Sequence, residues 1–265
     1  MAGRLIYVTY ASGPYEANLA RNGWFARHGM GADKVLLYRR ADLEAHPLYA
    51  ANRAVFDARR GAGYWAWKPL FIAEALKQAG PDDLVIYHDC GTGLRYKTVL
   101  YPRRLIALAR KAGYLTGIRN DQFGKNRAWN RRRCLELMGL DSEQARDAAP
   151  VEAVISLWSA SAESRAFVEA WRDWCLNLDA IRDDSEEEKT GEDPAFIEHR
   201  YDQAILTNLT ELRRAPSLEV SREMLPFAKS ITMIEIELRA RESRFWRLVR
   251  GVLLRGASLR RRLRG

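Results

Sequence analysis

The sequence predicts an α/β fold in which helices pack against a mainly parallel sheet. Short apolar runs rich in β-branched and aromatic residues recur along residues 4–158, and segments with the 3–4 spacing of amphipathic helices separate them. Strands that alternate with helices in this way are typical of α/β domains. No linker or internal repeat interrupts residues 1–238, so we expect one domain there, followed by a basic tail over residues 239–265.

The first part of the chain predicts two strands and two helices. RLIYVTY and KVLLY are apolar runs with the composition of buried strands. Gly13-Pro14 and Gly61-Ala62-Gly63 mark breaks in the chain, because glycine and proline interrupt regular structure. In chain order we expect a strand over 4–10, a turn at 12–14, a helix over 15–29, a strand over 34–38 and a helix over 48–59.

The rest of the domain continues this alternation. Pro69 fits the first turn of a helix over 69–79, because its missing N–H has no partner to lose there. Gly80-Pro81 ends that helix, and DLVIY predicts a strand over 83–87. The remaining expected elements are helices over 102–112, 130–138, 162–178 and 194–210, strands over 114–118 and 151–158, and an acidic surface loop over 183–193.

The residues that follow the predicted strands are the candidates for ligand binding, because open α/β sheets bind ligands at the carboxyl ends of their strands. Thr9 and Tyr10 end the first strand, and His88 and Asp89 follow the third. Gly91 lies just beyond, where the absence of a side chain lets the backbone approach a ligand closely.

Asp89 has the best position among these candidates. A carboxylate at a strand end can hold a divalent metal, and the metal can hold phosphates. A turn or cap role explains the same aspartate equally well. His88 is either a second ligand or a hydrogen-bonding group, and Cys90 is more typical of a buried, inert thiol than of a nucleophile.

A second acidic candidate lies in the segment EHRYDQ. His199 and Asp202 are three residues apart, so on a helix they would share one face and could make a joint contact. Gln203 follows directly. The alternative is that these residues form only the polar face of an amphipathic helix.

The segment GYWAWKP places two tryptophans beside a lysine. On an extended segment, Trp65 and Trp67 would face the same side and could stack on a sugar or a base. The alternative is that both pack in the core. Lys68 favours a binding role, because it adds positive charge at the start of a helix, where backbone N–H groups already favour an anion.

The composition limits the classes of function. The three cysteines are far apart and form no metal-ligand spacing or disulfide framework, which indicates a reducing, cytoplasmic setting. We expect neither a signal peptide nor a membrane span. The net charge of +9 resides in residues 239–265, which hold ten arginines and one acidic residue, Glu242. A neutral domain without a nucleic-acid motif predicts no nucleic-acid partner.

The tail combines these arginines with apolar residues such as Phe245, Trp246 and Leu253. This pattern favours a basic amphipathic helix on an anionic membrane surface. The alternative is a C-terminal helix docked on the domain, with a frayed basic end.

Several of these segments together resemble a bacterial glycosyltransferase family of the nucleotide-diphospho-sugar transferase type. The resemblance rests on RLIYVTY, GYWAWKPLFIAEAL followed by DDLVIYHDCG, PVEAVISLWSASAESRAFVEAW and EHRYDQAIL, which agree with the family's motifs in order and spacing. It covers residues 4–209. It implies a GT-A fold, that is, a Rossmann-type sandwich that binds a sugar nucleotide at the strand ends.

In such folds an Asp-x-Asp motif at a central strand end holds a metal that binds the diphosphate. Asp89 corresponds to the first aspartate, but Gly91 replaces the second, which puts a Mn²⁺ or Mg²⁺ cofactor in doubt. Either His88, His199 or Asp202 completes a metal site with Asp89, or cations such as Lys68 and Arg119 neutralise the diphosphate.

The implied activity is transfer of a sugar from a nucleotide-diphosphate donor to a glycan or lipid-linked acceptor, in cell-surface polysaccharide or lipopolysaccharide synthesis on the inner face of the cytoplasmic membrane. Asp202 and Asp89 are the expected catalytic residues, with Asp202 as the base if the enzyme inverts. Asp89 and His199 are the expected metal ligands. The alternative is a non-catalytic relative that binds sugars or sugar nucleotides. The expected donor-binding residues are Thr9, Tyr10, Trp65, Trp67, Lys68, His88, Asp89, Gly91 and Gln203.

Overall fold

The computed structural model describes residues 3–90, 102–121, 124–140 and 142–219. Gly91, a candidate ligand-binding residue, and the basic tail over 239–265 lie outside the described residues. Within the described ranges, no helix combines the length and the apolar character that crossing a bilayer would require.

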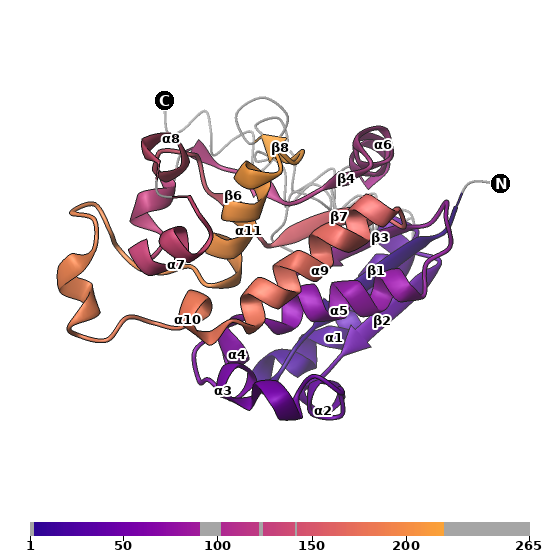
Figure 1. Ribbon diagram of the computed structural model, residues 1–265. Coiled ribbons are helices and arrows are strands. Elements are labelled where there is room, and N and C mark those ends of the chain that lie inside the picture. The colour runs from indigo at the N-terminus through magenta and orange to yellow at the C-terminus, as the bar shows by residue number, and fades with distance from the viewer. Residues whose placement is uncertain (1–2, 91–101, 122–123, 141, 220–265) are drawn as a thin grey trace, which may run out of the picture.

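Five strands form the main sheet, in the order β2-β1-β3-β7-β4 (Figure 1). They are β1 (Leu5–Tyr10), β2 (Lys34–Tyr38), β3 (Leu84–His88), β4 (Tyr114–Leu115) and β7 (Ile155–Ser159). Strand β1 pairs in parallel with β2 and β3, whereas β7 pairs antiparallel with β3 and β4. Four strands therefore run in one direction and β7 runs in the other. The predicted α/β class is confirmed, with a mixed sheet.

Two predicted strands are each divided between two sheets. The 114–118 run gives β4 and then β5 (Ile118–Arg119), and the 151–158 run gives β6 (Val151–Glu152) and then β7. A second sheet of three strands has the order β6-β5-β8, with β8 at Leu218–Glu219. Gly117 permits the crossing, because a Cβ atom there would lie 2.4 Å from the carbonyl oxygen of Glu152.

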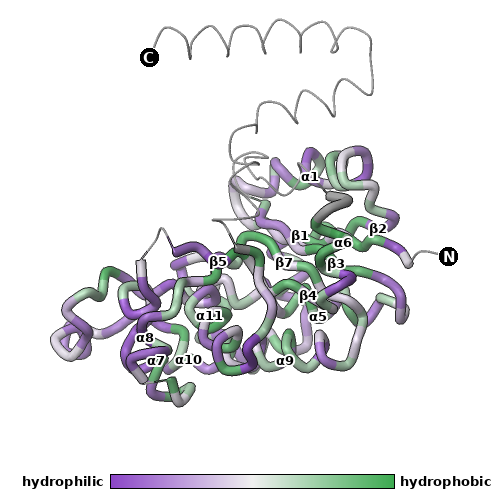
Figure 2. The backbone as a smooth tube through the Cα atoms, turned by 90° about the horizontal axis from the view of Figure 1, so that it is seen from above, coloured by the Kyte–Doolittle hydropathy of each residue, from purple (hydrophilic) through white to green (hydrophobic). Residues whose placement is uncertain are grey.

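Helices cover both faces of the main sheet. On one face, α5 (Trp67–Lys77), α9 (Ala162–Leu176) and α11 (Asp202–Leu212) pack against Val8, Val85 and Trp158. On the other, α1 (Leu19–Phe25), η2 (Ala26–Met30) and α6 (Pro102–Ala112) form a core with Tyr7, Ile86 and Leu157. Successive residues of a strand point to opposite faces, which explains why these strands are apolar throughout. Figure 2 shows the hydrophobic strands between the two helical layers.

The remaining elements are short and connect this framework. They are η1 (Gly13–Asn18), α2 (Arg40–Glu44), η3 (Ala50–Asn52), α3 (Arg53–Phe56), α4 (Gly61–Tyr64), η6 (Asn126–Ala128), α7 (Arg132–Leu137), α8 (Glu143–Arg146), α10 (Leu178–Ile181) and η7 (Glu188–Gly191). The helix predicted over 48–59 is therefore reduced to η3 and α3, and α2 was not predicted.

Helix α11 begins eight residues later than the predicted helix over 194–210. The backbone of the intervening segment bonds to a neighbouring loop rather than to itself: the N–H groups of Ile197 and Arg200 donate to the carbonyls of Ala128 and Trp129. Tyr201, at φ +50°, then turns the chain into the helix. His199 therefore lies outside the helix, and the prediction that it shares a helical face with Asp202 is wrong.

A left-handed turn connects α3 to α5. All five residues from Gly61 to Trp65 have positive φ angles, between +51° and +106°. Each non-glycine residue in this conformation costs about 1–2 kcal/mol. The turn persists because other contacts fix it, among them the bond from the N–H of Gly63 to the carbonyl of Ala58 at 2.8 Å.

Gly61→Ala is expected to destabilise the protein more than Gly31→Ala does. Both glycines have positive φ, so each substitution carries a backbone cost of about 1–2 kcal/mol. At Gly61 the added Cβ would also lie 2.2 Å from the Trp65 ring, whereas at Gly31 it would meet no atom within 4 Å. The clash should add roughly 1–3 kcal/mol in urea unfolding. Equal losses in the two variants would contradict this account of the turn.

Candidate functional site

The largest of three adjoining cavities lies at the carboxyl ends of β1 and β3, which are parallel neighbours. It has a volume of about 560 Å³. Its walls come from the segment after β1, from the left-handed turn and from the end of β3: Tyr10, Ala11, Ser12, Gly13, Pro14, Tyr15, Arg59, Gly61, Ala62, Trp65, Trp67, Asp89 and Cys90. We call it the main cavity. The strand-end rule thus predicted its position from the sequence.

A narrower cavity of about 190 Å³, the inner cavity, meets the main cavity at Trp65 and Asp89. Its lining comprises Arg60, Trp65, Lys68, Asp89, Ala153, Val154, Arg200, Tyr201, Asp202 and Gln203. A third cavity of about 540 Å³, the outer cavity, is lined by Ala58, Arg59, Arg60, Gly61, Tyr64, Trp65 and Asp183. Trp65 is the residue that lines all three.

A lysine between two aspartates forms the charged centre of the inner cavity. The ammonium nitrogen of Lys68 lies 3.0 Å from Oδ2 of Asp202 and 3.3 Å from Oδ1 of Asp89. It also donates to the carbonyl oxygen of Ala153 at 3.1 Å. A lysine ammonium has three N–H donors. The ammonium donates one of them to Ala153 and forms ion pairs with the two carboxylates, so Lys68 holds Asp89 and Asp202 on either side of one cation.

The electrostatics of this centre follow from its burial. Lys68 and Asp202 are each 3% exposed. Burial opposes the charged form of Lys68, but the two carboxylates outweigh it and raise its pKa. Burial also raises the pKa of Asp202 to about 6, although Lys68 partly offsets the effect. With one lysine between two carboxyl groups, Asp202 can take or release a proton close to neutral pH.

Asp89 is the open part of the centre. Its side chain is 27% exposed, and its backbone N–H donates to the carbonyl of Val154 at 2.9 Å. The hydroxyl of Tyr87 donates to Oδ1 at 2.5 Å, so Tyr87 and Lys68 both hold the same carboxylate oxygen. Because Asp89 borders the main and inner cavities, its carboxylate is available to a ligand that extends from one to the other.

Asp202 is the first residue of α11. A carboxylate in the first turn of a helix is favoured by the helix dipole. The indole N–H of Trp171 donates to the backbone carbonyl of Asp202 at 2.9 Å, which anchors the start of the helix to α9. Gln203, the next residue, also lines the inner cavity but not the main cavity.

Thr9 and His88, which were predicted to bind a ligand at the strand ends, instead stabilise the sheet. The hydroxyl of Thr9 donates to the carbonyl of His88 at 2.6 Å and links β1 to β3. Both side chains are buried, and burial lowers the pKa of His88. Neither residue is among those that line the three cavities.

Trp65 and Trp67 do not lie on an extended segment, so the prediction of a shared face is wrong in its geometry. Trp65 ends the left-handed turn at φ +58°, and Trp67 begins α5. Trp67 is buried against Tyr10, with ring centroids 4.2 Å apart, and its indole N–H donates to the carbonyl of Gly61 at 3.1 Å. Nevertheless Tyr10, Trp65 and Trp67 all form part of the wall of the main cavity.

His199 is engaged elsewhere as a structural residue. Its Nδ1 accepts from the backbone N–H of Arg131 at 3.3 Å, and its Nε2 donates to the carbonyl of Ala180 at 3.1 Å. Burial and the nearby Arg131 lower its pKa to about 3, so it stays neutral. With both ring nitrogens used, His199 has no lone pair to offer a metal, which corrects the prediction that it is a ligand.

The described residues do not fit a preassembled divalent-metal site. The ammonium of Lys68 occupies the space between Asp89 and Asp202 that a bridging cation would need. In the described part of the chain, no group of three or more histidine, cysteine, aspartate or glutamate side chains is arranged to hold a metal. Arg119, an alternative partner for the diphosphate, instead pairs with Glu211 at 2.6 Å.

Sequence reasoning missed the arginines and the tyrosine that complete the site. Arg59 and Arg60 line the outer cavity, while Arg200 and Tyr201 line the inner cavity. The Tyr201 ring lies 5.3 Å from that of Tyr64. In the sequence, the two successive arginines directly before the glycine-rich break, Arg59 and Arg60, could have indicated this positive charge at the site. Cys90 behaves as predicted, because burial raises its pKa to about 11 and keeps it a thiol.

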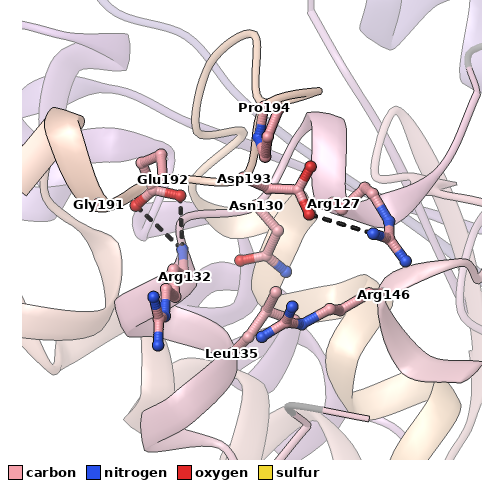
Figure 3. A pocket seen from close by; sticks show the side chains of 9 residues that line it. All are labelled: Arg127, Asn130, Arg132, Leu135, Arg146, Gly191, Glu192, Asp193 and Pro194. Carbon is pink, nitrogen blue, oxygen red and sulfur yellow. Dashed lines mark hydrogen bonds and ion pairs between the residues drawn. The ribbon is translucent and has the colours of Figure 1, made fainter. Parts of the chain in front are cut away.

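Another cavity, of about 180 Å³, lies apart from this site and shares no lining residue with it (Figure 3). Arg127 pairs with Asp193 at 3.1 Å, and the backbone N–H of Arg132 donates to Glu192 at 2.9 Å. This ion pair and this hydrogen bond fasten the segment before α11 to η6 and α7, so we interpret the cavity as structural.

No protein-family model matches the chain, and a search of curated proteins gives no match.

Proposed function

We propose that this protein is a glycosyltransferase that moves a sugar from a nucleoside diphosphate donor to a hydroxyl of a glycan or lipid-linked acceptor. The observation that carries the proposal is the Asp89–Lys68–Asp202 centre at the junction of two cavities. One of its carboxylates is open to a ligand and the other has a pKa near neutrality. Such a pair can separate the tasks of binding a sugar and accepting a proton.

The main cavity suits the donor. Its volume of about 560 Å³ falls within the range of pockets for cofactor-sized ligands, roughly 300–1,000 Å³. Tyr10, Tyr15, Trp65 and Trp67 give it aromatic walls, on which bases and sugars stack. The resemblance of the sequence to nucleotide-diphospho-sugar transferases supports the same ligand, as does a sheet in which β1 and β3 end at the cavity.

The inner cavity suits the reacting hydroxyl of the acceptor. In the proposed step, the bond between the sugar anomeric carbon and the diphosphate oxygen breaks, and the electron pair leaves with the diphosphate. A bond forms from the acceptor oxygen to the same carbon, and the hydroxyl proton passes to Asp202. In this proposed arrangement the acceptor in the inner cavity attacks from the side of Asp202, opposite the leaving group in the main cavity, so the step inverts the anomeric configuration.

Asp89 is assigned to the donor sugar. One of its oxygens is held by Tyr87 and Lys68, which orients the carboxylate, and the other can accept hydrogen bonds from sugar hydroxyls. Because the described residues do not fit a preassembled metal site, we route no step through a metal ion. The GT-A assignment, a role in cell-surface polysaccharide synthesis and attachment to the cytoplasmic membrane through residues 239–265 belong to this proposal.

The function is tested with a panel of nucleoside diphosphate sugars. We expect wild-type protein to release the nucleoside diphosphate from at least one donor, with or without Mn²⁺, and Asp89→Ala to lose at least about 100-fold of this activity. Glu44→Ala, at an exposed carboxylate of α2, is the matched control and should retain full activity. Absence of turnover on every donor, with tight binding of a sugar nucleotide, would instead indicate a non-catalytic binding relative.

A further inference from the structure

The charged residues around the main cavity leave one cation without a carboxylate. Only Arg59 and Asp89 are charged among its described lining residues. Asp89 is already paired with Lys68. The positive charge of Arg59 is therefore uncompensated within the cavity, and this favours an anionic ligand.

Lys68 cannot supply the cation for that ligand. Its ammonium is already ion-paired with Asp89 and Asp202 and donates to the carbonyl of Ala153, and its side chain is 4% exposed. To bind a phosphate, it would have to break one of these contacts and leave a buried acceptor unpaired, which costs about 1–3 kcal/mol. A cation for a phosphate group must come from another residue.

Arg59 differs from the arginines near it in the sequence. Arg53 and Arg40 pair with Asp57 at 3.0 and 2.6 Å, and Arg60 pairs with Glu198 at 3.1 Å. Arg59 is exposed, and within the described part of the chain its guanidinium makes no hydrogen bond or ion pair. A guanidinium can donate two parallel N–H bonds to a phosphate, which makes it the strongest side-chain partner for that group.

The backbone around Arg59 is held in place. Its carbonyl accepts from the N–H of Ala62 at 3.3 Å, and the preceding carbonyl, of Ala58, accepts from Gly63 at 2.8 Å. These bonds fix the start of the left-handed turn that also carries Trp65. Arg59 lines both the main and the outer cavity, so it borders the region where the two cavities adjoin.

We propose that Arg59 binds the phosphates of a nucleoside diphosphate in the main cavity, so that a guanidinium stabilises the negative charge of the leaving group. This inference rests on the proposed function and deepens it, because it names the residue whose positive charge selects an anionic ligand. It also explains how a centre with Gly91 in place of a second aspartate can accept a diphosphate.

The test is calorimetric titration with UDP, GDP, ADP and dTDP, and with the matching nucleosides, in the presence of EDTA. We expect Arg59→Ala to weaken the tightest nucleoside diphosphate about 10- to 100-fold and to leave the nucleoside unchanged, with Arg59→Lys in between. Arg27→Ala is the control, because Arg27 is exposed and lines none of the cavities described above. It should stay within about twofold of wild type.

Three outcomes would overturn the proposal: unchanged diphosphate affinity in Arg59→Ala, loss of wild-type binding in EDTA, or no binding of any nucleoside diphosphate. The result is separable from the transferase activity. If no donor sugar is transferred but diphosphate affinity depends on Arg59, the binding site stands and the proposed function fails. If transfer occurs and Arg59→Ala binds normally, the function stands and this assignment fails.

Discussion

Replacing Lys68 with methionine is expected to lower the free energy of unfolding by about 3–5 kcal/mol at pH 7. Methionine has a similar length, so the packing changes little, but the ammonium between Asp89 and Asp202 is lost. Asp202 then stays buried, at 3% exposure, without its cation. An unpaired buried carboxylate is among the most destabilising features that a substitution can create.

The size of this loss should depend on pH. Without Lys68, burial and the nearby charge of Asp89 raise the pKa of Asp202 further. The folded protein then binds more protons than the unfolded chain between about pH 4 and the raised pKa, so stability falls as the pH rises through this window. Urea unfolding of Lys68→Met is therefore expected to show a smaller loss at pH 5 than at pH 7.

Two comparisons isolate the charge effect. Lys77→Met removes an exposed lysine from the same helix and is expected to cost less than about 1 kcal/mol. Adding Asp202→Asn to Lys68→Met removes one of the stranded carboxylates, so the double variant should recover at least about 1 kcal/mol. If the loss is pH-independent and Asp202→Asn does not relieve it, the stability of Lys68→Met is governed by packing and not by charge.

Asp202→Asn is expected to lower kcat by about 10²- to 10⁴-fold while the fold is retained. Asparagine keeps the shape of the side chain and can still accept a bond from Lys68, but it cannot take a proton from the acceptor. The folded-state pKa of Asp202, about 6, lies above its ordinary value, so its ionised form costs stability above that pH. Lys68 keeps Asp89 as its carboxylate partner, so the variant should remain folded at pH 7.

The pH profile distinguishes a base from a structural carboxylate. In wild type, kcat/KM should fall tenfold per pH unit below about pH 6, where Asp202 becomes protonated. This limb should be absent from the residual activity of Asp202→Asn. Asp173→Asn, an exposed control on α9, should keep the full profile. Retention of anomeric configuration in the product, or an unchanged limb in the variant, would remove Asp202 from the role of base.

The candidate site was partly predictable, because its residues lie in short, distinctive segments. The strand-end rule and the GYWAWKP segment led to Asp89, Trp65 and Lys68 before any contact was known. Their partners could not be predicted in this way. Lys68 was expected to face an anionic ligand, but it forms ion pairs with Asp89, which follows β3, and with Asp202, which begins α11.

The sequence by itself determined the apolar elements of the framework. Strands β1 and β3 and helices α5 and α9 were predicted within a few residues. A strand that is buried on both faces is a continuous apolar run, and a helix that is buried along one side has apolar residues every three to four positions. Both patterns can be seen in a short stretch of sequence. Local spacing thus carries the information about which segments enter the core.

Only the tertiary structure decided the direction of β7, the left-handed turn and the start of α11. Each depends on contacts between distant segments: β7 pairs antiparallel to β3, the turn packs against Tyr201 through Tyr64 and Trp65, and the segment before α11 bonds to Ala128 and Trp129. A backbone N–H or C=O group can form its hydrogen bond with a partner that is near or far in the sequence. The spacing of apolar residues along the chain therefore does not show which partner it has. For the same reason, the sequence did not reveal that His199 bonds to Ala180 instead of sharing a helix face with Asp202, or that Asp202 pairs with Lys68.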